Sequence, residues 1–265
     1  MSVSSDTRSI SVIRARFSAA GLPTLGAASA LLAWWTATTV FNVSSFFLPS
    51  PADIMTAFRK QPEYLLRESW VTMTETLIGF GIAAASGLLI AMVLTASSVI
   101  QRATLPLLVA LNSIPKVAIA PLLVVWMGFG QGPKITLVLL ICFFPVVVST
   151  MSGLTSTPAD FGELARSLSA SWWRVYFKVR LPWALPQIFV GLKVAISLAV
   201  IGAVVAEISN PDRGLGSVIV LSGQSFDTPL AFTALVLLAL MSVMLFYVIC
   251  AVERLLLPWA RAISA

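Results

Sequence analysis

Long apolar runs separated by short polar segments dominate this chain. A helix that crosses a bilayer needs about 20 mostly apolar residues, and six of the runs reach that length. Lys116 interrupts the third run and Lys193 the fifth. The pattern predicts an all-α membrane protein with six transmembrane helices, lying within residues 22–41, 76–101, 103–127, 135–152, 187–206 and 228–252.

One polar, basic stretch, residues 157–182, separates the fourth run from the fifth. Thr157 suits a helix N-cap, and Pro158 suits the first helical position, where its missing N–H costs nothing. The following residues repeat at helical spacing and place one apolar face on a short helix, formed by Phe161, Leu164, Ala165 and Leu168.

A second short helix is predicted after Ser171, which can cap it. Its apolar stripe consists of Trp172, Val175, Tyr176 and Val179, while Arg174 lies off that stripe. We expect Leu181 and Pro182 to end this helix and Pro186 to begin the fifth span. Two capped, striped helices between membrane spans are more than a linker.

Composition agrees with a membrane protein. Only 11% of the 265 residues are charged and 58% are hydrophobic, whereas a soluble domain carries about 25% charged residues. The absence of histidine excludes imidazole metal sites and His-based catalytic triads. A net charge of +6 is typical of basic cytoplasmic loops in such a protein, so we expect no nucleic-acid partner.

The distribution of Lys and Arg predicts the orientation. Six spans put both termini on one side, and a cytoplasmic N-terminus puts ten of the 17 basic residues inside and five outside. The uncharged run at 22–41 exceeds the 7–15 apolar residues typical of a signal peptide, so we expect a retained first span. The ten inner residues are Arg8, Arg14, Arg16, Arg102, Arg166, Arg174, Lys178, Arg180, Arg254 and Arg261.

The same orientation places residues 157–182 in the cytoplasm and residues 42–70 outside. Pro49 and Pro51 predict a rigid turn in the outer segment, followed by a short interfacial helix from Asp53 to Phe58. The cytoplasmic pair of helices has two interpretations on physical grounds alone. It lies on the membrane surface with its basic residues toward lipid phosphates, or it docks a soluble partner.

The residues of this loop resemble the EAA loop of permeases from binding-protein-dependent ABC importers. That pattern reads E-A-A, three residues, G, nine residues, I, one residue, L-P. Glu163, Ala165, Leu181 and Pro182 match it, and Val179 matches conservatively. Two positions depart from it, with Leu164 in place of the middle alanine and Ser169 in place of the glycine.

Other segments resemble the subgroup that takes up nitrate, sulfonates, taurine and thiamine precursors, namely 48–51, 114–130 and 214–216. The resemblance implies a type I importer fold in a bacterial plasma membrane, with one permease domain over 1–265, a cytoplasmic tail over 1–21 and a cytoplasmic coupling loop over 153–186. It also implies a homodimer, two cytoplasmic ATPase subunits that carry ATP and Mg, and an extracytoplasmic binding protein. The coupling residues would be Phe161, Glu163, Leu164, Ala165, Leu168, Ser169, Arg174, Leu181 and Pro182.

Charged and small residues within the spans suggest where a solute pathway runs. Lys116 lies too deep to reach the interface easily, and Pro115 and Pro121 bracket it, so we expect a broken backbone there. Lys116 either lines the pathway beside Asn112, or binds backbone carbonyls or bridges two subunits without contacting the solute. Gly191, Ala195 and Ala199 form a small-residue stripe on the fifth span, for helix packing or for the pathway. Glu207, near the outer end, is either a gate or an interfacial carboxylate, and Lys193 can extend toward the inner interface.

The expected function is therefore import of a small solute without chemistry on this chain. No Gly-x-x-x-x-Gly-Lys-Ser/Thr phosphate loop is present in the sequence, so ATP hydrolysis belongs to another subunit. A sulfonate-like, taurine-like or nitrate-like anion is the first substrate choice, and a pyrimidine thiamine precursor is the alternative. A secondary carrier is a weaker alternative because we see no internal repeat between the two halves.

Overall fold

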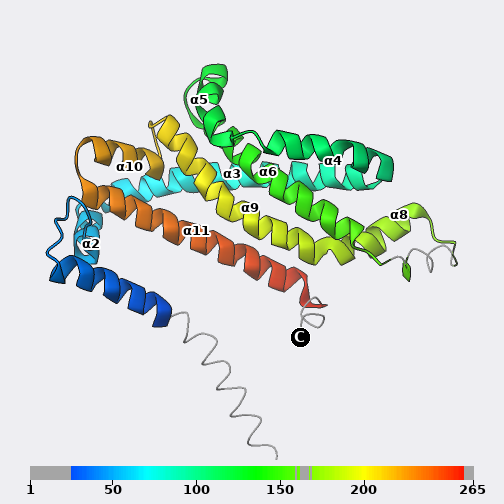
Figure 1. Cartoon of the computed structure of the whole chain (residues 1–265), viewed down its shortest axis with the longest axis horizontal. Helices are drawn as coiled ribbons and strands as arrows, with labels where there is room; N and C mark the ends of the chain where they lie inside the picture. Colours follow the sequence, from blue (N-terminus) through cyan, green and yellow to red (C-terminus); the bar gives the residue numbers. More distant parts are fainter. Residues whose placement is uncertain (1–24, 159, 162–166, 168, 260–265) are drawn as a thin grey trace, which may run out of the picture. The chain divides into compact units, whose positions relative to one another are not determined.

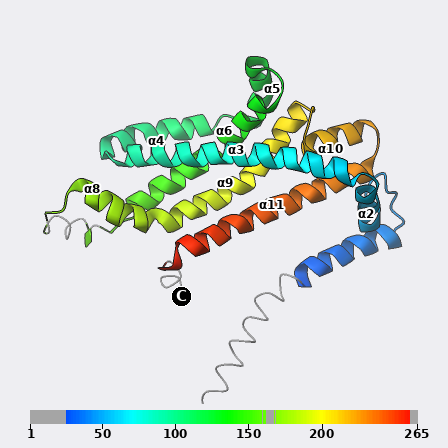
Figure 2. The same ribbon diagram turned by 180° about the vertical axis from the view of Figure 1, so that it is seen from behind.

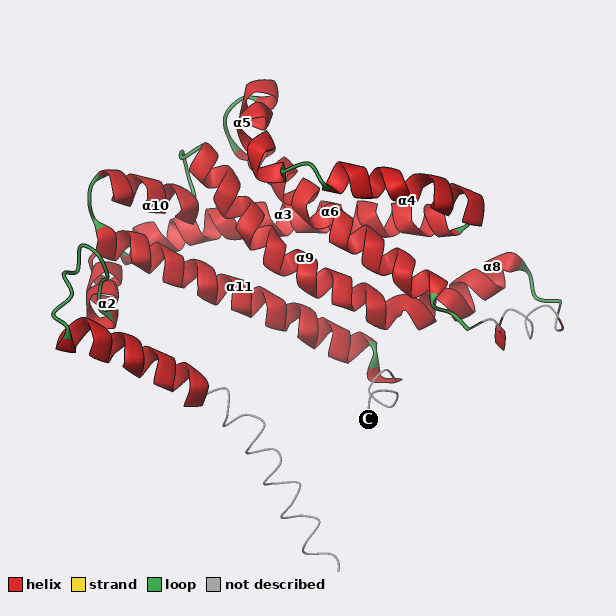
Figure 3. Ribbon diagram, viewed as in Figure 1, coloured by secondary structure: helices red, strands yellow, loops and turns green. Residues whose placement is uncertain are grey.

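The computed structural model describes residues 25–158, 160–161, 167 and 169–259. All regular structure among them is helical (Figure 3). After an apolar helix over Leu25–Val40, the elements are α2 (Pro51–Lys60), α3 (Pro62–Thr95), α4 (Ser98–Asn112), α5 (Lys116–Met127), α6 (Gln131–Thr155), α8 (Trp172–Val175), the π-helical turn η1 (Tyr176–Arg180), α9 (Leu181–Ser209), α10 (Leu215–Gln224) and α11 (Thr228–Leu256).

The spans agree with the all-α membrane prediction. Four helical segments are long and apolar enough to cross a bilayer: Pro62–Thr95, Gln131–Thr155, Trp172–Ser209 and Thr228–Leu256. Val99–Asn112 and Lys116–Met127 form a fifth, bent by 83°. The described part of the first predicted span, Leu25–Val40, is apolar but shorter. Six spans are compatible with this arrangement.

The second span was predicted to lie within residues 76–101. The helix that contains it, α3, begins before that range, at Pro62, and ends inside it, at Thr95. The helix starts early because Glu63, Arg67 and Glu68 are good helix formers and do not stop it. The third predicted span, over 103–127, breaks between α4 and α5, next to Lys116, where a broken backbone was expected. Pro115 causes the break because it disfavours the α conformation at the residue before it.

One compact unit contains residues 25–61 and 222–233. Within it, Ser50 caps α2 in a capping box with Asp53: each side chain accepts a hydrogen bond from the other's backbone N–H, at 3.2 and 2.9 Å. Thr233 donates a hydrogen bond to the Ile54 carbonyl at 3.2 Å. The predicted short helix after Pro51 is confirmed.

The second unit contains residues 62–221 and 234–259. Its core is α6, which packs against both α3 and α9 (Figures 1 and 2). Three small residues of α3, Gly79, Ala83 and Gly87, are buried. A Cβ at Gly79 would lie only 2.6 Å from the Cβ of Val138 on α6. These three small residues of the second span therefore serve packing within the subunit.

Gly79 and Gly81 form a matched pair for testing this close approach. Gly81 lies two residues along α3, is exposed and has no atom within 4 Å of a built Cβ. We expect Gly79→Ala to destabilise by about 1–3 kcal/mol through overpacking, and Gly81→Ala to stabilise by up to about 1 kcal/mol through helix propensity. Thermal melting of the purified variants in detergent measures the difference. Equal melting temperatures would contradict the packing argument.

Candidate functional site

The predicted coupling loop is only partly described. Glu163, Leu164, Ala165 and Leu168 lie outside the described residues. Phe161 is 40% exposed, and its ring lies 5.7 Å from that of Trp183, near the start of α9. Within the expected loop over 153–186, the described residues are helical at 153–155, 160–161, 167 and 172–186.

Ser169 is a turn residue with a positive φ of 52°. This left-handed region costs residues with a Cβ roughly 1–2 kcal/mol, and glycine pays nothing. The turn therefore has the conformation that the glycine of the EAA pattern suits, although the chain places a serine there. Ser169 therefore departs from the EAA pattern in residue type but forms a turn at that position.

Tyr176 anchors the segment after this turn to the second unit's core. Its side chain is 3% exposed, and its hydroxyl donates to the Met92 carbonyl at 2.9 Å and lies 3.0 Å from the Thr95 hydroxyl. The ring of Trp172 stacks on Tyr176 with centroids 4.9 Å apart. The sequence pattern placed Tyr176 on an apolar stripe but did not predict its hydrogen bond to α3. The one feature of the sequence that could have suggested this bond is the tyrosine hydroxyl on an otherwise apolar stripe.

The predicted helix end at Leu181 and Pro182 was wrong. The chain remains helical from Trp172 to Ser209, through η1 into α9. Pro182 lies at the start of α9, after a π-helical turn. A widened turn of this kind accommodates a residue that lacks an N–H and crowds the preceding turn. Arg174 lies in the last turn of α8, on the same continuous helical segment.

Lys116 and Asn112 meet at the break between α4 and α5. The Lys116 ammonium donates to the Asn112 carbonyl at 2.9 Å and to its Oδ1 at 2.5 Å. Lys116 therefore satisfies a carbonyl in the last turn of α4, where helices need such partners. This is the carbonyl-bound geometry that the sequence left as an alternative to a role in the pathway.

The small residues of α9 lie against α6. Ala195 and Ala199 are fully buried, and the Cys142 thiol of α6 donates to the Ala195 carbonyl at 3.1 Å. A Cβ at Gly191 would lie 2.8 Å from the Ser149 hydroxyl. These three residues bring the fourth and fifth spans together within one subunit.

Glu207 belongs to a buried polar cluster at the end of α9. Its carboxylate accepts hydrogen bonds from the Thr72 hydroxyl at 2.7 Å and from the Gly216 N–H at 2.6 Å. Thr72 in turn accepts from the Leu215 N–H at 2.8 Å, and Glu68 accepts from the Gly214 N–H at 2.7 Å. The first N–H groups of α10 are thus bound by acidic and hydroxyl groups, as a helix N-terminus favours.

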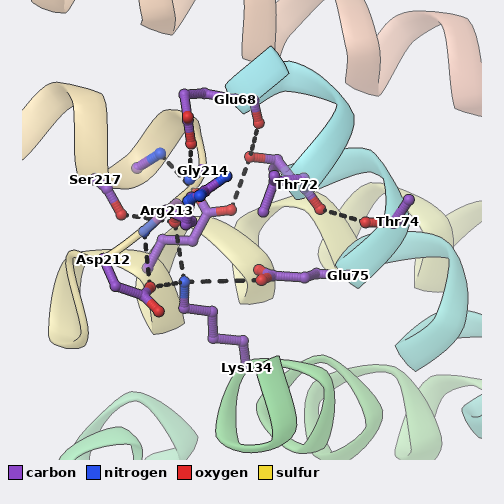
Figure 4. A network of polar contacts seen from close by, with 12 residues as sticks. Glu68, Thr72, Thr74, Glu75, Lys134, Asp212, Arg213, Gly214 and Ser217 are labelled. Atoms are coloured by element: carbon purple, nitrogen blue, oxygen red, sulfur yellow. Dashed lines mark hydrogen bonds and ion pairs between the residues drawn. The ribbon is translucent and has the colours of Figure 1, made fainter. Parts of the chain in front are cut away.

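Lys134 supplies the positive charge of this cluster (Figure 4). Its ammonium donates to the Asp212 carboxylate and, at 2.9 Å, to the Arg213 carbonyl, and lies 3.7 Å from Glu75 Oε1. The side chains of Lys134 and Glu75 are each 1% exposed, whereas that of Asp212 is 42% exposed. The cluster thereby joins α3, α6 and the loop between α9 and α10 through the buried charges of Lys134 and Glu75 and the partly exposed charge of Asp212.

Sequence reasoning did not find this cluster. The sequence pattern singled out only Glu207 among its members. Asp212 lies 78 residues from Lys134 along the chain, so no local spacing joins them. The glycines were a partial signal: Gly214 has a φ of 100°, and a Cβ at Gly216 would lie 2.8 Å from the Cβ of Glu207.

Removing the buried ammonium is expected to be costly. Lys134→Met leaves Glu75 buried without its charge partner, which costs about 3–5 kcal/mol. Arg67→Met is the control, because Arg67 is 62% exposed in its ion pair with Glu68, and such pairs contribute about 0–1 kcal/mol. Lys134→Met combined with Glu75→Gln should recover part of the loss. Thermal melting in detergent tests all three, and an unchanged Lys134→Met melting temperature would disprove the role of the charge.

Comparison with known proteins defines the class. The chain belongs to the family of binding-protein-dependent transport system inner membrane components, whose profile matches residues 78–262. It is therefore a multi-pass membrane component of an ABC importer, which works with an ATPase and a substrate-binding protein. The EAA-type resemblance and the sulfonate-type subgroup expected from the sequence are confirmed.

Two curated relatives represent the two substrate types considered. The formylaminopyrimidine transport permease protein ThiX of Halalkalibacterium halodurans is 32% identical, over 82% of this chain and 87% of the relative. The taurine transport system permease protein TauC of Escherichia coli is 28% identical, over 86% of each. The chain thus resembles permeases named for quite different solutes.

A solved structure supports the fold. An inward-facing MetNI methionine ABC transporter chain matches with a TM-score of 0.64 and 20% identity, over 74% of this chain and 97% of that chain. The type I importer permease fold expected from the sequence is confirmed.

Proposed function

We propose that this chain is the solute-translocating subunit of an ATP-driven importer for a small anion of the sulfonate, taurine or nitrate type. One observation carries the proposal. This chain belongs to the importer family and has a loop with the EAA pattern between two core helices, α6 and α9. In the proposed complex, two copies of the chain enclose the pathway and two ATPases bind the two loops. The whole chain, 1–265, acts as one permease domain.

The described contacts of the loop suit transmission of movement from an ATPase. Phe161 contacts Trp183 on α9, and Tyr176 binds the end of α3. Force applied to the loop therefore reaches two helices that both pack on α6. Glu163 is proposed to contact the ATPase, with Leu164, Ala165 and Leu168 filling its groove beside Phe161. Ser169, Arg174, Leu181 and Pro182 shape the following turn and helix.

The proposed orientation puts the loop, the N-terminus and the C-terminus in the cytoplasm of a bacterial cell. It rests on the excess of Lys and Arg in the segments on that side. The same orientation puts the cluster around Glu207 at the outer face, where a binding protein docks. The chain itself performs no catalysis and binds no cofactor, because ATP and Mg belong to the ATPase.

The proposed pathway passes the break between α4 and α5. A bent span exposes polar backbone at membrane depth, which is tolerated where it lines a cavity. Lys116 would present a positive charge to an anion there, beside Asn112. Gly191, Ala195 and Ala199 would shape the pathway indirectly, by setting the distance between α6 and α9. Glu207 would act through the loop that it holds.

The proposal of an anionic substrate gains support from TauC, which is named for taurine, a sulfonate. The alternative of a pyrimidine-type substrate gains support from ThiX, which is named for formylaminopyrimidine. The positive charge at Lys116 favours the anion. A pyrimidine-type solute would need no cation in the pathway, but Lys116 alone does not decide between the two substrates.

Glu163→Gln tests the proposed docking. A hydrogen bond to a charged group contributes about 1.5–3 kcal/mol, so loss of the charge should weaken ATPase binding by about tenfold or more. Binding of the purified ATPase to the permease in detergent, and uptake in proteoliposomes with binding protein and ATP, measure this. Glu63→Gln, on the other side of the membrane, is the control. Normal binding and uptake in Glu163→Gln would overturn the docking role.

Lys116→Gln tests the pathway. We expect uptake of taurine or another alkyl sulfonate to fall about tenfold, with ATPase stimulation by the binding protein retained, and Lys116→Arg to keep most uptake. Asn112→Ala is the control, because it removes one acceptor and keeps the charge. Full uptake by Lys116→Gln would leave Lys116 as a helix cap without a role toward solute.

A further inference from the structure

A large cleft opens beside the coupling loop in the second unit. Its volume is about 1050 Å³, and it lies between the first turns of α9 and the end of α11. Pro186 and Val190 line it on α9, and Leu257 lines it after α11. Phe161 and Lys178 contribute from the loop side. The cleft is distinct from the cluster around Glu207, which lies at the opposite end of α9.

Aromatic rings border the cleft. Trp183 and Trp259 both line it and are 41% and 48% exposed, and Phe161 lies against Trp183. Exposed tryptophans at the ends of membrane spans are typical of the level of the lipid headgroups, where a ring meets both apolar and polar surroundings. The cleft therefore lies at a membrane–water boundary and extends from it along apolar side chains.

The charge of the lining is positive. Lys178 and Arg254 are basic and exposed. The lining has one described carboxylate, that of Glu253, and Lys193 of α9 pairs with it at 2.8 Å. The negative charge of Glu253 is thus matched by a residue outside the lining. This ion pair also replaces the predicted extension of Lys193 toward the interface. Among the described lining residues, Lys178 and Arg254 give two positive charges against the one negative charge of Glu253.

We propose that this cleft binds an anionic phospholipid of the cytoplasmic leaflet. Its phosphate lies between Lys178 and Arg254, and an acyl chain lies along Pro186, Val190 and Leu257. Basic pockets between membrane helices on the cytoplasmic side bind anionic headgroups in this manner. A small soluble anion would use the two cations and leave most of the apolar lining uncovered. The assignment of the leaflet rests on the proposed orientation.

The lipid would connect two parts of the subunit. Among the described residues, the cleft is bordered by the coupling loop on one side and α11 on the other. A headgroup bound by Lys178 and Arg254 would hold the segment that leads from the loop against the end of the last span. Coupling between ATPase and permease would then depend on the anionic lipid content of the membrane.

Native mass spectrometry of the full-length permease in detergent tests the site. Equal amounts of phosphatidylglycerol and phosphatidylcholine are added, and the retained lipid is counted. Each basic residue near an anionic headgroup contributes about fivefold in binding. We therefore expect the wild-type protein to retain phosphatidylglycerol in preference to phosphatidylcholine. Lys178→Gln should retain about fivefold less phosphatidylglycerol. Arg102→Gln is the matched control, since Arg102 is exposed on the same side and lies outside the cleft.

A photo-crosslinking residue at Val190 identifies the occupant. In membranes, crosslinks to phospholipid support the proposal, whereas crosslinks to a second copy of the chain or to the ATPase overturn it. Displacement of phosphatidylglycerol by millimolar taurine or inorganic phosphate would assign a solute site and also overturn it. Equal loss in Lys178→Gln and Arg102→Gln would do the same. These measurements need no ATP, ATPase or transported solute, so their failure would leave the Glu163→Gln result to decide the transport proposal separately.

Discussion

The close approach of α6 to α3 and α9 is the contact on which the rest of the described core depends. It exists because glycine and alanine face α6 from both sides, so the backbones meet without intervening side chains. In a membrane, apolar burial gives little drive for helix association, and close packing must supply it. Both the end of α3 that holds Tyr176 and the end of α9 that holds Glu207 take their positions from this packing.

The two ends of the core use different chemistry. At one end, buried carboxylates and Lys134 hold the loop between α9 and α10, a rigid arrangement in which each charge has a partner. At the other end, aromatic rings and a single tyrosine hydroxyl hold the segment after the coupling loop. The first end is costly to open, while the second contains few polar bonds. Movement of a docked ATPase would meet less resistance at the second end.

Hydropathy was sufficient to predict an all-helical membrane protein and the approximate place of its spans, because every backbone group in a bilayer must be bonded internally. The short helix after Ser50 was also predictable, since its capping box is local. The break beside Lys116 was predictable from the prolines on either side of it, although only Pro115 breaks a helix while Pro106 and Pro121 remain within helices. The cluster around Lys134 was missed, because its partners lie far apart in the sequence and meet only after the helices pack.

The continuous helix from Trp172 to Ser209 has a mechanical consequence. α8 turns away from the axis of α9 at the π-helical turn (Figures 1 and 2). The 29 residues of α9 make a rod about 44 Å long, with Glu207 near its outer end, and a tilt of about 5° about one end moves the far end by about 4 Å. The π-helical turn at Tyr176–Arg180 lies close to the end that a docked ATPase would move. Bending at this turn would therefore set how much of that displacement reaches the outer face.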